Sequence, residues 1–172
     1  MSEAVDYSVV VLCRNGQPIE IRALKPSDRT ELLQAVRRTT AKSIYRRFFG
    51  SKRTFSEREI QYFVNVDYVN HVALVAVAKQ DGQDIIIGGG RYVVVRPGTA
   101  ELAFTVVDEY QGQGIGAALM QHLVKLARNA GIKQLVADVL PDNTSMLKVF
   151  EKSGLGIKTK READAIHVTL EI

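Results

Sequence analysis

Three alternate glycines separate a β-branched run from an amphipathic stretch in the segment FTVVDEYQGQGIGAALMQHL, residues 104–123. Gly112, Gly114 and Gly116 weaken the start of a helix, but they let a ligand approach the bare backbone closely. Unpaired N–H groups and the helix dipole both favour an anion at such a point. The spacing therefore predicts that residues 111–116 hold the pyrophosphate of a phosphate-bearing cofactor.

Two other phosphate loops and an empty turn are the alternatives for this segment. A P-loop is excluded, because it would end in Gly-Lys-Ser/Thr and Gly116 is followed by two alanines. Gly112, Gly114 and Ala117 also fit the G-x-G-x-x-A form of a Rossmann fingerprint, and Asp138 falls about 20 residues further on. Only a short tail follows Asp138, which is too little for a second nucleotide-binding half. A glycine-rich turn without a ligand stays open.

The elements around the glycines alternate between strands and helices. Asn15-Gly16 indicates a hairpin turn, so residues 1–17 are expected to form an extra N-terminal arm. Helices are predicted through residues 28–40, capped by Ser27, and after the capping box at Ser56. The remaining predictions are strands near 71–79, 85–95 and 100–107, a helix at 115–130, a strand at 133–140, a helix at 144–154 capped by Asn143, and two final strands near 155–160 and 165–171. The glycines at 88–90 predict a bulge or a close approach to the backbone.

The order of these elements predicts the fold class. The first half is mainly antiparallel and the second half reads β-α-β-α-β, which indicates an α+β (mixed α/β) single domain over residues 1–172. A chain of 172 residues with 46% hydrophobic residues is an ordinary globular composition. We expect a cytoplasmic protein, because no apolar run reaches the roughly 20 residues that cross a bilayer and the N-terminus lacks a basic signal region.

Cysteine and histidine usage gives little chemistry. Cys13 is the single cysteine, which excludes an internal disulfide, and its apolar neighbours indicate a buried residue. His71, His122 and His167 are isolated in sequence, so we expect no metal site. The oligomeric state is left open.

Most of the formal charge of +4 comes from one segment. Residues 37–53, RRTTAKSIYRRFFGSKR, hold seven basic residues and no acid. This run is either a solvated helix face or a surface that meets an acidic partner, protein or nucleic acid.

The glycine segment resembles the signature of the GNAT superfamily of acyl-CoA-dependent N-acetyltransferases, Q/R-x-x-G-x-G/A at the entrance to a helix. Residues 111–116, QGQGIG, match it in full. The expected element order from about residue 18 to 171, including Asn143 before the late helix, is also similar to the family's. The resemblance implies a GNAT fold, in which a central, mostly antiparallel sheet is flanked by helices and splayed between its fourth and fifth strands, here near 100–107 and 133–140.

A narrower likeness precedes the glycines. SIYRRFF, VDYVNHVALVA and AELAFTVVDEYQGQGIG are similar to bacterial Pat-type protein-lysine acetyltransferases, which modify AMP-forming acyl-CoA synthetases. This likeness implies a protein lysine as acceptor, with an acyl-CoA synthetase as one such substrate. Members of that group often carry an added domain, for which we see no room here.

The family resemblance also implies which residues hold acetyl-CoA, expected to be the cosubstrate. Backbone groups near Thr105, Val106 and Val107 would pair with the pantetheine arm, and one would face the developing oxyanion. The N–H groups of the loop and first helical turn would hold the pyrophosphate, and Asn143 would contact the pantetheine or simply cap its helix. The full predicted set is Thr105, Val106, Val107, Gln111, Gly112, Gln113, Gly114, Ile115, Gly116, Ala117 and Asn143.

Acetyl transfer to an amine also requires a base, because a lysine is mostly protonated at pH 7. Glu101 is the first candidate, since its place in AELAF is similar to that of the base in the protein-acetylating branch. Strand alternation puts it on one face with Ala103 and Thr105. Asp138 is the second candidate, and each acid has a purely structural alternative. Phe150 stands where many members have a tyrosine, so we name no general acid.

The predicted function is direct acetyl transfer to a protein lysine, without a covalent enzyme intermediate. Acetylation of a small amine is the alternative, and an acceptor cleft lined with acids would favour it. A non-catalytic acyl-CoA sensor, or a protein that binds nucleic acid through residues 37–53, would be a different class. We expect neither a membrane nor a nucleic acid as partner.

Overall fold

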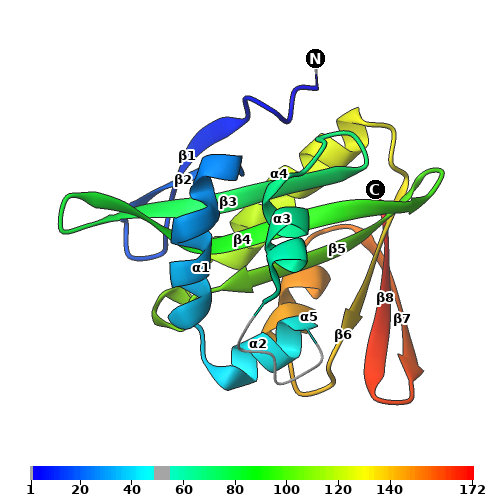
Figure 1. The fold of residues 1–172 in the computed structure, drawn as a ribbon. Helices are drawn as coiled ribbons and strands as arrows, with labels where there is room; N and C mark the ends of the chain where they lie inside the picture. The colour runs from blue at the N-terminus through cyan, green and yellow to red at the C-terminus, as the bar shows by residue number, and fades with distance from the viewer. Residues whose placement is uncertain (1, 49–54) are drawn as a thin grey trace.

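A computed structural model of the chain describes residues 2–48 and 55–172 and shows one eight-stranded sheet in the order β1-β2-β3-β4-β5-β6-β8-β7. Helices cover both faces of it, with α1 and α3 on one side and α4 on the other (Figure 1). The strands are β1 Ser8–Leu12, β2 Pro18–Ala23, β3 His71–Gln80, β4 Gln83–Arg96, β5 Thr99–Val106, β6 Gln134–Val139, β7 Gly156–Glu162 and β8 Ala165–Glu171. The helices are α1 Arg29–Arg37, α2 Ala41–Phe48, α3 Glu57–Val64, α4 Ile115–Asn129 and α5 Thr144–Glu151, with 3₁₀ turns η1 Pro26–Asp28 and η2 Asp108–Tyr110.

The sheet opens between β5 and β6, as the family resemblance implies. These strands run parallel and pair only over Thr99–Glu101 and Gln134–Val136, although β5 continues to Val106. Every other neighbouring pair of described strands is antiparallel. Beyond Glu101 the two strands therefore diverge and leave strand edges without a strand partner.

The glycine run in β4 forms the expected bulge. Gly88 lies opposite Ala76 and Ile86 lies opposite Val77, so Ile87 is one residue extra on this strand. A Cβ on Gly90 would come within 2.8 Å of Leu123 in α4. The glycine is needed there because α4 packs directly on the strand.

Two apolar clusters hold the helices on the sheet. The larger cluster lies between the α4 face of the sheet and α4 itself, where Leu119 and Leu123 are fully buried. The smaller cluster joins Ala35 of α1 to Val75 of β3 and Ile86 of β4 on the opposite face. Because the two faces bury separate sets of side chains, the sheet is a central layer between two layers of helices.

Of the two predicted helix starts before β3, one differs from expectation and one is confirmed. Ser27 does not cap α1: Pro26–Asp28 form a 3₁₀ turn, in which the Asp28 carboxylate accepts the Lys25 N–H at 2.7 Å and pairs with Arg22. The capping box at Ser56 is confirmed, since its hydroxyl accepts the Glu59 N–H and the Glu59 carboxylate accepts the Ser56 N–H.

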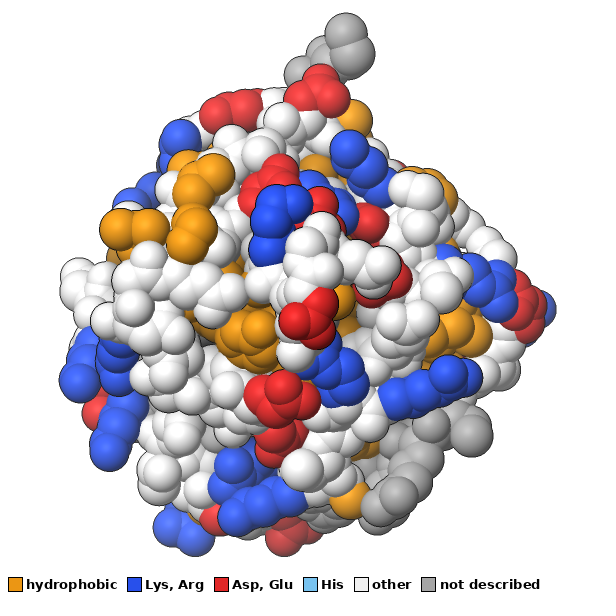
Figure 2. Space-filling model, turned by 90° about the vertical axis from the view of Figure 1, so that its left-hand side faces the viewer, with side chains coloured by type: hydrophobic (Ala, Val, Ile, Leu, Met, Phe, Trp, Pro, Cys, Tyr) orange, Lys and Arg blue, Asp and Glu red, His pale blue; other side chains and the backbone are white. Residues whose placement is uncertain are grey.

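The basic run at residues 37–53 divides between three regions. It covers the end of α1 and then α2, while its last five residues, 49–53, lie outside the described part of the chain. Seen from the side of the β3–β4 turn, basic and acidic side chains are interspersed over the surface (Figure 2). None of the described helices is both long enough and apolar enough to span a bilayer.

Candidate active site

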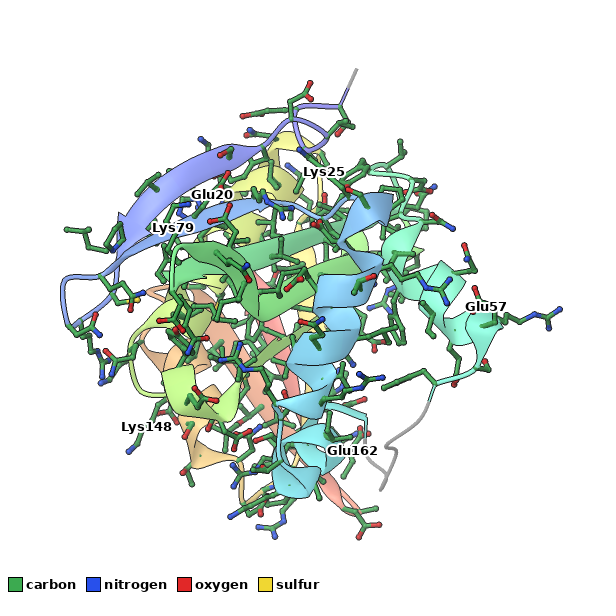
Figure 3. The ribbon with its side chains drawn as sticks, turned by 60° about the vertical axis from the view of Figure 1, so that its left-hand side comes forward. Glu20, Lys25, Glu57, Lys79, Lys148 and Glu162 are labelled. Atoms are coloured by element: carbon green, nitrogen blue, oxygen red, sulfur yellow. The ribbon has the colours of Figure 1, made fainter. Side chains whose placement is uncertain are left out.

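A cleft of about 750 Å³ lies where β5 and β6 part. Its walls are the second half of β5, the glycine loop, the first turns of α4, the end of β6 and α5. α5 carries Lys148 on the cleft side of the molecule, whereas Glu57 of α3 lies well away from it (Figure 3). The cleft therefore occupies the opening that the strand divergence creates.

The glycine loop presents its backbone to this cleft. Gly112 and Gly114 have φ values of +77° and +85°, which side chains with a Cβ rarely adopt. Gly114 is the N-cap of α4, and the first bond inside the helix runs from the Ala118 N–H to the Gly114 carbonyl. The N–H groups of Ile115, Gly116 and Ala117 precede that bond, so they have no acceptor within the helix. This geometry fits a pyrophosphate, and the expected cofactor residues at Gly112, Gly114, Ile115, Gly116 and Ala117 all line the cleft.

Two side chains hold the loop in place. Arg14, at the tip of the β1–β2 hairpin, donates its Nη1 to the Gly112 carbonyl and its backbone N–H to the Gln113 carbonyl, both at 3.1 Å. Gln111 donates its Nε2 to the Val106 carbonyl at 3.1 Å and to Ser43 Oγ at 3.2 Å. Sequence reasoning missed Arg14, because the only signal near it was the hairpin turn, which says nothing about the distant glycines.

The α2 helix is also tied to the loop, through an acid that follows β5. Asp108 accepts hydrogen bonds from the Thr40 N–H at 2.9 Å and from the hydroxyls of Thr40 and Ser43. Arg38 and Glu109 form an ion pair at 3.3 Å. Part of the basic run is therefore neutralised by the acids that flank the glycine loop.

The predicted backbone contacts of β5 divide into two groups. Thr105 and Val106 line the cleft. Val107 is buried on the α1 face, and its N–H donates to the Ile87 carbonyl at 2.8 Å. The Val107 carbonyl accepts the Tyr110 N–H at 2.9 Å, so both backbone groups of Val107 bond within the protein, and Val107 is not among the residues that line the cleft.

The two candidate bases lie on one face of the sheet. Glu101 is opposite Val136 in the last parallel pair, and Asp138 follows two residues further along β6. Both side chains are exposed, and Asp138 lines the cleft. Asp138 Oδ1 lies 2.8 Å from His167 Nδ1 on the neighbouring strand β8. Asp138 thus has a structural partner, while Glu101 stands at the point of divergence.

Arginines of α2 reach the same region. Arg46 lines the cleft and donates its Nη2 to the Asp142 carbonyl at 3.2 Å. Burial lowers the pKa of Arg47, and the nearby Glu101 carboxylate opposes that shift. Arg47 and Glu101 therefore attract one another electrostatically.

The late helix gives a cap and an apolar wall. Asn143 lines the cleft and also caps α5, since its Oδ1 accepts the Met146 N–H at 3.3 Å. Phe150, in the expected tyrosine position, is buried with its ring centroid 5.9 Å from that of Phe104. Tyr110 lines the cleft, but Tyr92 is buried in the core, where desolvation raises its pKa to about 12. A hydroxyl for the leaving thiolate could thus come from Tyr110 and not from Tyr92.

Cys13 and His71 are both buried in the fold. Cys13 is buried, as expected, and burial raises the pKa of its thiol. His71 is the buried first residue of β3, where its Nε2 lies 2.8 Å from Arg91 Nη1. Within residues 2–48 and 55–172, no three histidine, cysteine, aspartate or glutamate side chains converge as metal ligands would.

Comparison with known proteins points to one family. The model of the acetyltransferase (GNAT) family matches residues 38–155. Acetyltransferase PA5475 of Pseudomonas aeruginosa is 30% identical over 151 residues, which cover 87% of this chain and 80% of that protein. Acetyltransferase Pat of Mycolicibacterium smegmatis is 34% identical over 150 residues, or 85% of this chain, yet the match spans only 44% of Pat.

A solved structure repeats the relationship. The GNAT domain of S. lividans PAT superposes with a TM-score of 0.87 at 29% identity, covering 96% of this chain and 97% of that domain. This chain therefore shares its fold over nearly its whole length with the GNAT domain of S. lividans PAT.

Proposed function

The chain belongs to the GNAT family of acetyl-CoA-dependent acetyltransferases, and from this premise we propose that it transfers an acetyl group directly to a protein lysine. The observation that carries the proposal is the cleft itself. The glycine loop, whose first N–H groups have no acceptor within α4, lines it, and Glu101 lies where the strands part, next to the cleft-lining Leu102. The Pat-type relatives support a protein lysine as acceptor.

The proposed role of Glu101 follows from the protonation state of the acceptor. A lysine amine with a pKa near 10.4 requires about 4.6 kcal/mol to lose its proton at pH 7. Glu101 would accept that proton, directly or through one water, as the nitrogen attacks the thioester carbonyl. Bond formation to nitrogen and cleavage of the C–S bond then occur without a covalent enzyme intermediate. Cys13 is buried and is not among the residues that line the cleft, which agrees with direct transfer.

Charge around the acceptor side favours a protein over a polyamine. Arg46 and Arg47 line the cleft. Arg91 of β4 lies opposite Ala103 of β5, on the same face of the sheet as Glu101. Cationic walls repel a polycation and attract a lysine that has acidic neighbours. This supports an acidic surface patch around the target lysine, such as one on an AMP-forming acyl-CoA synthetase.

Intact-mass spectrometry tests the proposal. An AMP-forming acyl-CoA synthetase is incubated with acetyl-CoA and either the wild-type protein or Glu101→Gln. We expect one added acetyl group with the wild type and almost none with the variant. Glu20→Gln, on the distant strand β2, is the matched control and should acetylate like the wild type.

The outcomes separate the acceptor from the chemistry. No added mass, together with a melting temperature that acetyl-CoA still raises, would reject this protein acceptor while leaving cofactor binding in place. Equal acetylation by Glu101→Gln would reject Glu101 as the base.

A further inference from the structure

A second, smaller cavity of about 110 Å³ lies on the α1 side of the sheet. Apolar side chains of α1 and α3 form its roof, and the glycines at 88–90 together with β5 form its floor. Ala103, Thr105 and Arg47 line both this cavity and the cofactor cleft. The cavity therefore adjoins the cleft at the stretch of β5 where the acyl end of the cosubstrate is expected.

The charged groups in its wall are all cationic. Arg29, Arg47 and Arg91 line the cavity, and no carboxylate does so among the described residues. The charge of Arg29 is balanced outside it, because its guanidinium pairs with Glu57 through two hydrogen bonds. Arg91 has no carboxylate within ion-pair distance in the part of the chain that the structure describes.

Among the described residues, the side-chain hydrogen bonds of Arg91 use only its Nη1. Its Nη1 donates to the Phe63 carbonyl at 3.2 Å and lies 2.8 Å from His71 Nε2, and its guanidinium lies 4.9 Å from the Phe63 ring centroid. A guanidinium carries five N–H groups. The three on Nε and Nη2 have no hydrogen-bond partner among the described residues. Burial and the charge of Arg47 together lower the pKa of Arg91 to about 10, so an anion in the cavity would be stabilised.

Thr105 adds a second donor without a partner. Its Oγ1 is buried and makes no hydrogen bond to any described residue. Thr105 lies opposite Gly89, and the next residue pair along the two strands on that face is Ala103 opposite Arg91. A buried hydroxyl without a partner costs free energy unless a ligand satisfies it. An apolar pocket with a few convergent polar groups is typical of a small-molecule subsite.

We propose that this cavity binds a carboxylate at the end of a short acyl chain, so that the protein accepts dicarboxylic acyl-CoA donors such as malonyl-CoA and succinyl-CoA. A dry cavity of about 150 Å³ holds benzene, so 110 Å³ has room for roughly four or five non-hydrogen atoms. That is the size of the malonyl or succinyl chain beyond its thioester carbonyl. The inference rests on the acyl-CoA chemistry of the family and does not depend on which amine is the acceptor.

The reaction is the same acyl transfer with a charged tail. The amine nitrogen bonds to the thioester carbonyl carbon, the C–S bond breaks, and coenzyme A leaves as the thiolate, which then takes up a proton. The distal carboxylate does not react; Arg91 and Thr105 hold it. Its charge adds specificity, because a neutral chain of equal length leaves the same donors unsatisfied.

Calorimetric titration with acyl-CoA pairs of equal length tests the proposal. Succinyl-CoA is compared with butyryl-CoA, and malonyl-CoA with propionyl-CoA, so each pair differs mainly in charge. We expect the dicarboxylic member to bind at least tenfold more tightly, since hydrogen bonds to charged groups are the strong ones. Arg91→Gln should remove that preference. Thr105→Val, which replaces only a hydroxyl by a methyl group, should reduce it severalfold and covers the case in which Arg91→Gln does not fold.

Arg96→Gln, on the exposed end of β4, should keep the wild-type preference. Equal affinity for butyryl-CoA and succinyl-CoA would overturn the proposal, while tight acetyl-CoA binding and unchanged acetylation of the protein acceptor in the mass-spectrometric assay would show that the proposed function survives. The carboxylate could instead come from the acceptor. If Arg91→Gln weakens binding of a Glu-rich lysine peptide and leaves succinyl-CoA unaffected, the assignment to the donor is wrong.

Discussion

Glu101 and Asp138 lie on the same face of the sheet, on two strands that part immediately beyond Glu101. Asp138 is held by His167 of β8, whereas Glu101 interacts electrostatically with the Arg47 guanidinium. The two acids therefore lie on one face of neighbouring strands but have different partners. We expect their substitutions to have different effects on catalysis.

Glu101→Gln should lower kcat about 10²- to 10⁴-fold at pH 7, the usual contribution of a general base. Its dissociation constant for acetyl-CoA should stay unchanged, because Glu101 is outside the residues that hold the pyrophosphate. The rate of the variant should recover in part as the pH rises, since more of the amine is then already deprotonated. Steady-state kinetics across pH 6.5 to 9.5 measure both effects. Asp138→Asn should slow turnover much less; a larger loss there would exchange the roles of the two acids.

Gly114→Ala and Gly131→Ala form a matched pair at the two ends of α4. Both glycines have a positive φ, +85° and +81°, so alanine at either position should cost about 1–2 kcal/mol of the free energy of unfolding. For a chain of this length, each kcal/mol lowers the melting temperature by roughly 2–4 °C. Only Gly114→Ala should also weaken acetyl-CoA binding, because Gly114 lines the cleft and Gly131 does not. Calorimetry with and without ligand decides this, and equal loss of affinity in both variants would contradict the anion role of the loop.

Arg14→Ala should raise the dissociation constant for acetyl-CoA about 2- to 10-fold with little change in kcat. The lost bond from Nη1 to the Gly112 carbonyl is worth about 0.5–1.5 kcal/mol in fixing the loop. The backbone bond from the Arg14 N–H to the Gln113 carbonyl remains, so the fold should be unaffected. Isothermal titration measures the change, with Arg96→Ala, on the exposed end of β4 and outside the cleft lining, as the control. An unchanged affinity would show that the hairpin contact does not organise the loop.

The stability of the protein should fall in acid through His71. Burial and the charge of Arg91 lower the pKa of His71 to about 4, against a value near 6.5 in the unfolded chain. Between these two values the unfolded state binds the proton more strongly, so the stability from neutral His71 is complete above pH 6.5. It is lost as the pH falls towards 4, by at most about 3 kcal/mol.

Urea unfolding at pH 7, 5.5 and 4.5 checks this expectation, with His71→Gln as the comparison. The glutamine can still accept from Arg91 but does not titrate, so its stability should change less over this range. Asp67 also titrates nearby. Burial raises the pKa of its carboxyl, but hydrogen bonds from the backbone N–H groups of Val69, His71 and Asn70 outweigh this and lower it. Its contribution is therefore lost at lower pH than that of His71. Identical pH dependence in both proteins would contradict the assignment to His71.

The sequence predicted the elements that depend on local patterns. Alternation and turn residues located the strands, and the glycines before α4 predicted the turn and the helix start, because positive φ and helix starts leave direct signals in residue type. Ser27 failed as a cap because Asp28 binds Arg22, an interaction set by the fold and not by local sequence. Arg14 and Arg91 were missed for the same reason: each acts on residues that are distant along the chain.

Asn143 is the remaining residue with two interpretations, and three variants separate them. As the cap of α5 it accepts the Met146 N–H, so Asn143→Ala should cost about 1 kcal/mol of the free energy of unfolding. Asn143→Ser keeps a good capping oxygen but removes the amide that would reach the pantetheine, and Asn143→Asp keeps the cap and adds a charge. If the amide binds the cosubstrate, Asn143→Ser should keep its melting temperature and still bind acetyl-CoA several times more weakly. If Asn143 is only a cap, Asn143→Ser should match the wild type in both measurements, and only the alanine variant should change.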